Sequence, residues 1–124
     1  MPDVRILLVD DEEELVYTLV DRLEFRGYYA EAVLNGADAI KKIGHKYYNV
    51  VLLDVKMPEL NGIEVMRMIL KIQPKVKVIL MTGHGTLEEG EQGMAEGAYD
   101  YVIKPIDLDV LISKINAAAG INGK

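Results

Sequence analysis

The apolar residues fall into short unbroken runs that alternate with longer segments of helical periodicity. The run Val50–Leu53 is apolar at every position and ends at Asp54, a pattern typical of a strand buried on both faces of a parallel sheet. Comparable runs predict four further strands, over residues 4–9, 28–33, 76–81 and 99–103.

The segments between these runs have apolar residues spaced three and four positions apart. In the first of them Leu15, Leu19 and Leu23 fall on one helical face, and Gly27 supplies a C-terminal stop. By the same reasoning we expect helices over residues 12–26, 36–46, 62–73, 87–96 and 108–119.

Strand and helix alternate five times, with connections of a few residues. This alternation predicts an α/β fold, a doubly wound parallel sheet with helices on both faces and right-handed crossovers. We expect one domain over residues 1–124, with its core at about 4–119. Because all the strands run parallel, their carboxyl ends meet at one edge of the sheet, where open α/β sheets bind ligands.

Polar residues stand at the carboxyl ends of four predicted strands. They are Asp10 and Asp11 after the first, Asp54 at the third, Thr82 after the fourth and Lys104 after the fifth. Each alone is an ordinary turn residue, but their joint placement indicates a functional site. In a 2-1-3-4-5 strand order the first and third strands flank the switch point of the sheet, so the three acids meet there.

Composition and charge exclude several classes of function. The formal net charge of −6 argues against direct nucleic-acid binding, and the absence of cysteine excludes disulfides and thiolate metal sites. No apolar run approaches the roughly 20 residues of a membrane span, and the first residues do not resemble a signal peptide. We therefore expect a cytoplasmic protein with no membrane contact.

The acids themselves indicate the chemistry of the site. Three carboxylates in one cleft repel, and each pair about 4 Å apart costs on the order of 4 kcal/mol at an effective dielectric of 20. A divalent cation together with Lys104 neutralises them, and oxygen-only ligands favour Mg²⁺. Acids stand where a nucleotide-binding loop has glycines, so phosphoryl transfer with Asp54 as nucleophile is the better hypothesis.

Four motifs stand at the ends of the predicted strands, namely Val9–Glu12, Leu53–Pro58, Thr82–Gly85 and Tyr101–Pro105. In this order and spacing they resemble the receiver domain of two-component response regulators. The resemblance covers the chain from Val4 to about Ala119. It implies a flavodoxin-like (βα)5 three-layer sandwich whose five-stranded parallel sheet has the order 2-1-3-4-5.

The resemblance implies that Asp54 accepts a phosphoryl group from a phosphohistidine. The donor would be a sensor histidine kinase or a phosphotransfer protein. Asp11 and Asp54 would ligate Mg²⁺ directly, with the backbone carbonyl of Lys56 as a third protein ligand and Asp10 acting mainly through water. The chain would catalyse its own phosphorylation and dephosphorylation, without a metabolite as substrate.

The same resemblance assigns roles to the ends of the last two strands. Thr82 would hydrogen-bond the phosphoryl group, and Lys104 would pair with it. Tyr101 would be the switch aromatic that turns inward when Thr82 moves, and the Lys104–Pro105 peptide would be cis. The output would be a changed surface around the fourth helix, fifth strand and fifth helix, which acts on an unknown output domain or protein.

Two other functions compete with this one. A Mg²⁺-dependent phosphatase of the haloacid dehalogenase type also uses an aspartate nucleophile, but it needs a second Asp where Lys56 stands. A degenerate receiver that binds partners without phosphorylation would lack an acid, the threonine or the lysine, and none is missing.

The fourth helix departs from the alanine-rich helix usual in the family, because Gly90 and Gly93 lie inside it. Each glycine costs a helix roughly 0.5–1 kcal/mol relative to alanine. Either the helix is poorly held until phosphorylation orders it, or the glycines permit close packing on the sheet. The sequence leaves both interpretations open.

Overall fold

The computed structural model describes residues 3–57, 61–83 and 87–121. Its core is a five-stranded sheet in which every strand runs parallel to its neighbours, in the order β2-β1-β3-β4-β5. The predicted strand order is therefore confirmed. The strands are β1 (Arg5–Val9), β2 (Tyr29–Val33), β3 (Val50–Asp54), β4 (Lys77–Thr82) and β5 (Asp100–Ile103).

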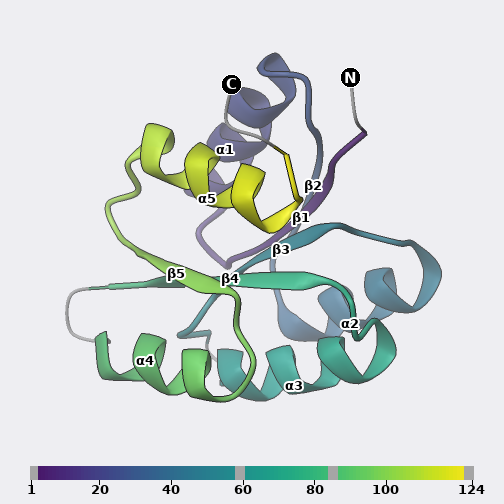
Figure 1. Ribbon diagram of the computed structural model, residues 1–124, viewed down its shortest axis with the longest axis vertical. Helices are drawn as coiled ribbons and strands as arrows, with labels where there is room; N and C mark the ends of the chain where they lie inside the picture. The colour runs from purple at the N-terminus through teal and green to yellow at the C-terminus, as the bar shows by residue number, and fades with distance from the viewer. Residues whose placement is uncertain (1–2, 58–60, 84–86, 122–124) are drawn as a thin grey trace.

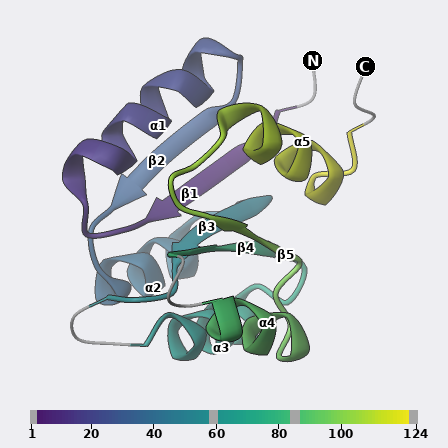
Figure 2. The same cartoon turned by 90° about the vertical axis from the view of Figure 1, so that its left-hand side faces the viewer.

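Five helices cover the two faces of this sheet. Helices α1 and α5 lie on one face, and α2, α3 and α4 lie on the other, which gives the three layers seen edge-on in Figures 1 and 2. This is the flavodoxin-like, doubly wound arrangement that the sequence predicts. The helices are α1 (Glu13–Phe25), α2 (Gly36–His45), α3 (Gly62–Ile72), α4 (Leu87–Ala95) and α5 (Leu108–Ala118).

Side chains of the central strand β3 enter both apolar cores, because successive residues of a strand point to opposite faces. Val51 and Leu53 pack in the core beneath α2, α3 and α4, whereas Val50 and Leu52 pack in the core beneath α1 and α5. All five residues of β3 are buried. The unbroken apolar run is thus explained by burial on both faces.

The fourth strand begins and ends one residue later than predicted. Thr82 is its last residue, paired in register with Ile103, whereas the sequence places it after the strand. The extra pairing extends the β4–β5 ladder by one step and fixes the Thr82 backbone. Parts of two motifs, Pro58 and His84–Gly85, lie outside the described residues.

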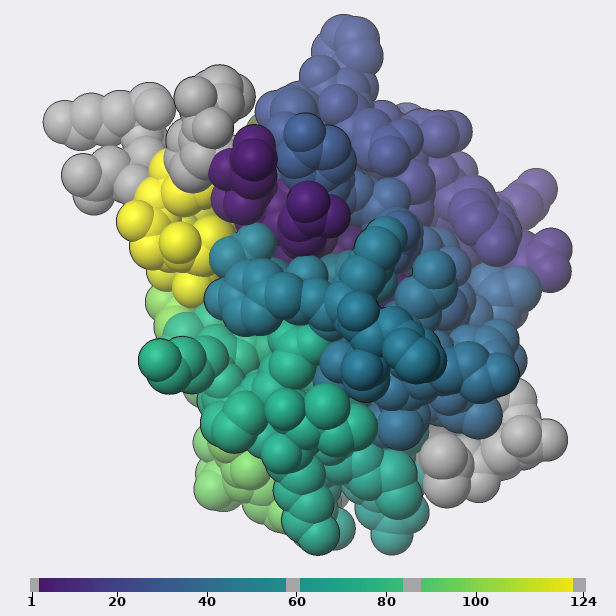
Figure 3. Space-filling view, turned by 90° about the vertical axis from the view of Figure 1, so that its right-hand side faces the viewer, coloured from purple at the N-terminus to yellow at the C-terminus, as the bar shows by residue number. Residues whose placement is uncertain are grey.

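The two ends of the described chain lie beside each other. Figure 3 shows the first residues in purple next to the last in yellow, on the side of the molecule that faces right in Figure 1. The Tyr28 hydroxyl donates a hydrogen bond of 2.5 Å to Asn116 Oδ1 and so joins the start of β2 to α5.

Within the described residues, none of the helices has the length and apolar character needed to cross a membrane.

Candidate functional site: an acidic cleft at the carboxyl edge of the sheet

Three carboxylates meet where β1 and β3 end. These strands are neighbours, with Val9 opposite Leu53, so the residues that follow converge. Carboxylate oxygens of Asp10, Asp11 and Asp54 all lie within 4.8 Å of one another. Asp10 is completely buried, Asp54 is 7% exposed and Asp11 is exposed. The structure therefore brings together the three acids that the sequence singles out.

Backbone groups hold these carboxylates in place. The Glu12 N–H donates to Asp10 Oδ1 at 2.9 Å, and the Lys56 N–H donates to Asp54 Oδ1 at 3.3 Å. Helix α3 begins against the loop after Asp54, where a Cβ on Gly62 would come within 2.5 Å of the Asp54 carbonyl oxygen. Only glycine permits this close approach, which keeps the turn after the acid compact.

Lys104 supplies the cation of the site from the end of β5. Its Nζ lies 2.9 Å from Asp10 Oδ2, 3.6 Å from Asp54 Oδ1 and 2.7 Å from Glu12 Oε1. Its backbone N–H donates to the Thr82 carbonyl, and the Lys104–Pro105 peptide is cis as predicted. Glu12 is the participant that the sequence does not single out: four acids in a row mark the region, but not which one reaches the lysine.

The charges of the cleft are unbalanced. Burial, and then the neighbouring Asp10 charge, raise the pKa of Asp54 to about 6, although Lys104 and the Lys56 N–H act in the opposite direction. Burial by itself lowers the pKa of Lys104, but the Glu12, Asp10 and Asp54 carboxylates outweigh it and raise that pKa overall. The single ammonium group of Lys104 cannot neutralise the charge of the carboxylates around it.

The donor set suits a hard divalent cation. A hollow of about 280 Å³ opens beside the acids. Among the described residues, the buried Asp10 Oδ2 forms an ion pair with Lys104 Nζ at 2.9 Å but has no hydrogen-bond partner. Oxygen ligands without sulfur or imidazole are those preferred by such ions. The hollow is lined by Asp11, Glu12, Asp54, Lys56, Gly83 and Lys104.

Thr82 and Tyr101 lie on the two strands beyond Asp54. Asp54 is opposite Met81 in the ladder, so Thr82 is one residue further along the neighbouring strand. The buried Thr82 hydroxyl donates to the Val102 carbonyl at 3.4 Å and is therefore engaged with β5. Tyr101 is partly buried and packs against the core on the α4 side.

Comparisons with known proteins agree with this geometry. The model of the family described as the response regulator receiver domain matches residues 6–116. The chain belongs to this family. As a receiver, it is a phosphorylation-activated switch of two-component signalling. The competing interpretation as a phosphorylation-independent module is not favoured.

Two of its relatives in sequence are longer proteins. The receiver is 37% identical over 118 residues to the "uncharacterized transcriptional regulatory protein YkoG" of Bacillus subtilis, covering 95% of this chain and 52% of that protein. It is 36% identical over 107 residues to the "regulatory protein AtoC" of Escherichia coli, covering 86% of this chain and 23% of that protein. The receiver thus spans about half of one relative and about a quarter of the other.

A solved structure shares its fold over nearly the whole length. The receiver superposes on a response regulator receiver domain protein (CheY-like) from Methanospirillum hungatei with a TM-score of 0.90 and 31% identity. The match covers 96% of this chain and 95% of that one. The fold predicted by resemblance is therefore confirmed.

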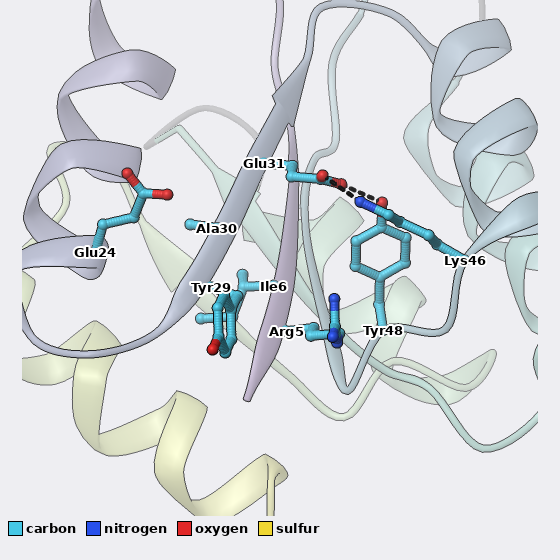
Figure 4. A pocket seen from close by; sticks show the side chains of 8 residues that line it. All are labelled: Arg5, Ile6, Glu24, Tyr29, Ala30, Glu31, Lys46 and Tyr48. Carbon is cyan, nitrogen blue, oxygen red and sulfur yellow. Dashed lines mark hydrogen bonds and ion pairs between the residues drawn. The ribbon is translucent and has the colours of Figure 1, made fainter. Parts of the chain in front are cut away.

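A second hollow lies away from the acidic cleft, where the paired strands β1 and β2 meet Lys46 and Tyr48 of the segment before β3 (Figure 4). It has a volume of about 170 Å³. Glu31 accepts hydrogen bonds from the Tyr48 hydroxyl at 2.5 Å and from Lys46 Nζ at 2.6 Å. The Arg5 guanidinium lies 5.3 Å from the ring centroid of Tyr29. Glu31, Tyr48 and Lys46 thus pair with one another across this hollow, which indicates a structural role for these groups.

Proposed function

We propose that Asp54 is the phosphoryl acceptor of this receiver. The observation that supports the role is the convergence of three carboxylates and Lys104 at the carboxyl edge of the two central strands. An Asp54 carboxylate oxygen attacks the phosphorus of a phosphohistidine, the P–N bond breaks, and the histidine leaves with the electron pair. Hydrolysis of the resulting acyl phosphate by water returns the carboxylate and inorganic phosphate.

The cation of the site would be Mg²⁺, held by Asp11, Asp54 and the backbone carbonyl of Lys56, with Asp10 acting through water. When bound, it neutralises charge on the carboxylates and on the phosphoryl oxygens. Lys104 is already within 3.6 Å of Asp54, so its ammonium group needs only a small movement to pair with a phosphoryl oxygen. Positioning and charge neutralisation account for most of the catalysis in reactions of this type.

The signal would pass from the phosphoryl group to the surface through Thr82 and Tyr101. In the resting state the Thr82 hydroxyl donates to Val102. A phosphoryl oxygen is a stronger, charged acceptor, so the hydroxyl exchanges the Val102 carbonyl for it. Tyr101 then turns inward, and the surface formed by α4, β5 and α5 changes.

The partners follow from the same proposal. The protein donor would be a sensor histidine kinase or a phosphotransfer protein, as membership of the receiver family implies. The 124 residues form one receiver domain. Both relatives described above are regulatory proteins, and one is named as transcriptional, which supports an output in transcriptional regulation through an output domain or a separate protein.

Acetyl phosphate with Mg²⁺ tests the acceptor directly. The wild-type protein should gain one phosphoryl group by intact mass, and hydroxylamine should remove it because an acyl phosphate is labile to this nucleophile. Asp54→Asn should gain none, whereas Asp21→Asn, which changes an exposed carboxylate on α1, should behave as wild type. Equal hydroxylamine-labile phosphorylation of Asp54→Asn would contradict the assignment.

A further inference from the structure

Helix α4 is attached to the sheet differently from the other helices. Among its residues 88–95, the two that are buried are both glycines, Gly90 and Gly93. Met94, the large apolar residue in this segment, is 40% exposed. By contrast, α3 buries Ile63, Val65, Met66 and Ile69 in the same core. The described part of α4 therefore contacts the sheet mainly through its backbone.

The contact at Gly93 has no room for a side chain. A Cβ at this position would lie 2.1 Å from Leu80 Cδ1, far inside van der Waals contact. Leu80 is completely buried in the middle of β4, so its side chain has little freedom to move away. The absence of a side chain at residue 93 sets how closely α4 approaches β4.

The contact at Gly90 involves the two residues of the proposed switch. A Cβ there would lie 3.1 Å from Thr82 Cγ2 and 3.2 Å from Tyr101 Cδ2. The Thr82 methyl group and the Tyr101 ring thus rest against the same turn of α4. Any displacement of this turn changes the space available to both side chains.

One polar tether holds the other side of the helix. Arg67 of α3 forms an ion pair with Glu96, the residue after α4, and Gln92 donates to the second Glu96 oxygen at 3.0 Å. These groups are partly or fully exposed, and exposed ion pairs contribute little to stability. The position of α4 therefore depends chiefly on the close fit at the two glycines.

We propose that Gly90 and Gly93 form a seat for α4, and that lifting the helix from this seat changes the α4–β5 surface without any phosphoryl group. The inference deepens the proposed function, because this surface is part of the one that phosphorylation is proposed to change. In this arrangement Gly93 sets the resting position of the helix, and Gly90 transmits that position to Tyr101. Both are positioning residues.

Amide hydrogen exchange and NMR of Asp54→Asn variants test the seat without phosphorylation. Gly93→Ala in this background should accelerate exchange across residues 88–95 by at least about tenfold. It should also shift the amide signals of Tyr101 to Ile103. Gly44→Ala is the matched control, since it changes a helical glycine whose Cβ would meet nothing within 4 Å. Adding Leu80→Val, which removes the Cδ1 atom, should return exchange towards that of the control.

Slow exchange in Gly93→Ala, equal to that of Gly44→Ala and without shifts in β5, would overturn the seat. If Gly93→Ala unfolds the whole chain, Gly90→Ala decides, because its milder contacts leave room for adjustment. That variant should shift the Tyr101 ring signals and accelerate exchange in α4, and unchanged signals and exchange would equally overturn the proposal. Every protein here carries the Asp54→Asn change, so this test and the acetyl phosphate test can fail separately.

Discussion

Two carboxylate–lysine groups of this receiver differ in how completely their charges are matched. Glu31 on the edge strand accepts hydrogen bonds from Lys46 and from the Tyr48 hydroxyl, and Lys42 lies 3.9 Å away. Lys46 and then Tyr48 hold the pKa of Glu31 below its ordinary value. Asp54, by contrast, is buried beside Asp10, and its pKa rises to about 6.

The difference indicates that Glu31 stabilises the fold, whereas Asp54 lowers its stability at a site that serves function. Each partner of Glu31 favours the ionised form in the folded state, so the group stabilises the fold when it is charged. The folded state disfavours the ionised form of Asp54 relative to the unfolded chain, so its charge lowers the stability of the fold until a bound cation offsets it. The direction of the pKa shift thus distinguishes the two roles where the residue types alone do not.

The largest effect expected is a difference in sign between Asp54→Asn and Glu31→Gln. Without divalent cations at about pH 7.5, Asp54→Asn should raise the free energy of unfolding by about 2 kcal/mol, because it removes a desolvated and repelled charge. Glu31→Gln should lower it by about 1 kcal/mol, a value reduced by solvent screening of this partly exposed site. Urea denaturation of the three proteins measures both changes.

The pH dependence sharpens this prediction. The folded-state pKa of Asp54 lies above its ordinary value of 3.8, so the contribution of Asp54 to wild-type stability falls as pH rises from about 4 to 6. The advantage of Asp54→Asn should therefore be small near pH 4 and complete above pH 6. The pKa of Glu31 is lowered, so the deficit of Glu31→Gln should be present at neutral pH and diminish in acid. Parallel curves for the two variants would remove the distinction.

The pattern of apolar and acidic residues within short segments was enough to predict the strands and the acids of the site. The unbroken run before Asp54 and the acids after β1 predicted buried parallel strands that end together, and the structure places these acids within 4.8 Å. The strand order rested on resemblance as well as periodicity, since alternation alone does not order parallel strands.

Contacts between distant segments account for what the sequence did not predict. The Glu31–Tyr48 hydrogen bond joins residues 17 positions apart, and no periodicity marks it. Glu12 was one of four adjacent acids, and its direction towards Lys104 depends on how β1 and β5 are placed. At Gly90 and Gly93 composition allowed two interpretations, and the burial of both residues favours close packing.

Mg²⁺ should stabilise the wild-type protein and Glu31→Gln alike. A ligand that binds only the folded state at ten times its Kd raises the free energy of unfolding by about 1.4 kcal/mol. Asp11→Asn should gain much less, because the exposed carboxylate it removes is one of the three that could hold the ion. Urea denaturation with and without MgCl₂ measures the gain, and an equal gain in Asp11→Asn would exclude Asp11 as a ligand.

Removing the Tyr48 hydroxyl should have a smaller effect at the other carboxylate. Tyr48→Phe keeps the buried ring but removes a donor to the Glu31 carboxylate, which should lower the free energy of unfolding by about 1 kcal/mol. Glu31 keeps Lys46 as a partner, so the loss is partial. In a double-mutant cycle the effects of Tyr48→Phe and Glu31→Gln should be non-additive, since both alter the same hydrogen bond. Strict additivity would show that the Tyr48–Glu31 hydrogen bond contributes nothing to the free energy of unfolding.

The smallest effect on stability is expected for Glu12→Gln, which alters the acidic cleft at its rim. The Glu12 side chain is 61% exposed, so its ion pair with Lys104 should contribute no more than about 0.5 kcal/mol. Its carboxylate is not among the three that could hold a metal ion together, and Lys104 keeps Asp10 and Asp54 as partners. We therefore expect Mg²⁺ affinity, measured by calorimetric titration, to fall by less than in Asp11→Asn. An equal or greater loss in Glu12→Gln would place Glu12 among the ligands and would enlarge the charge imbalance that sets this cleft apart from Glu31.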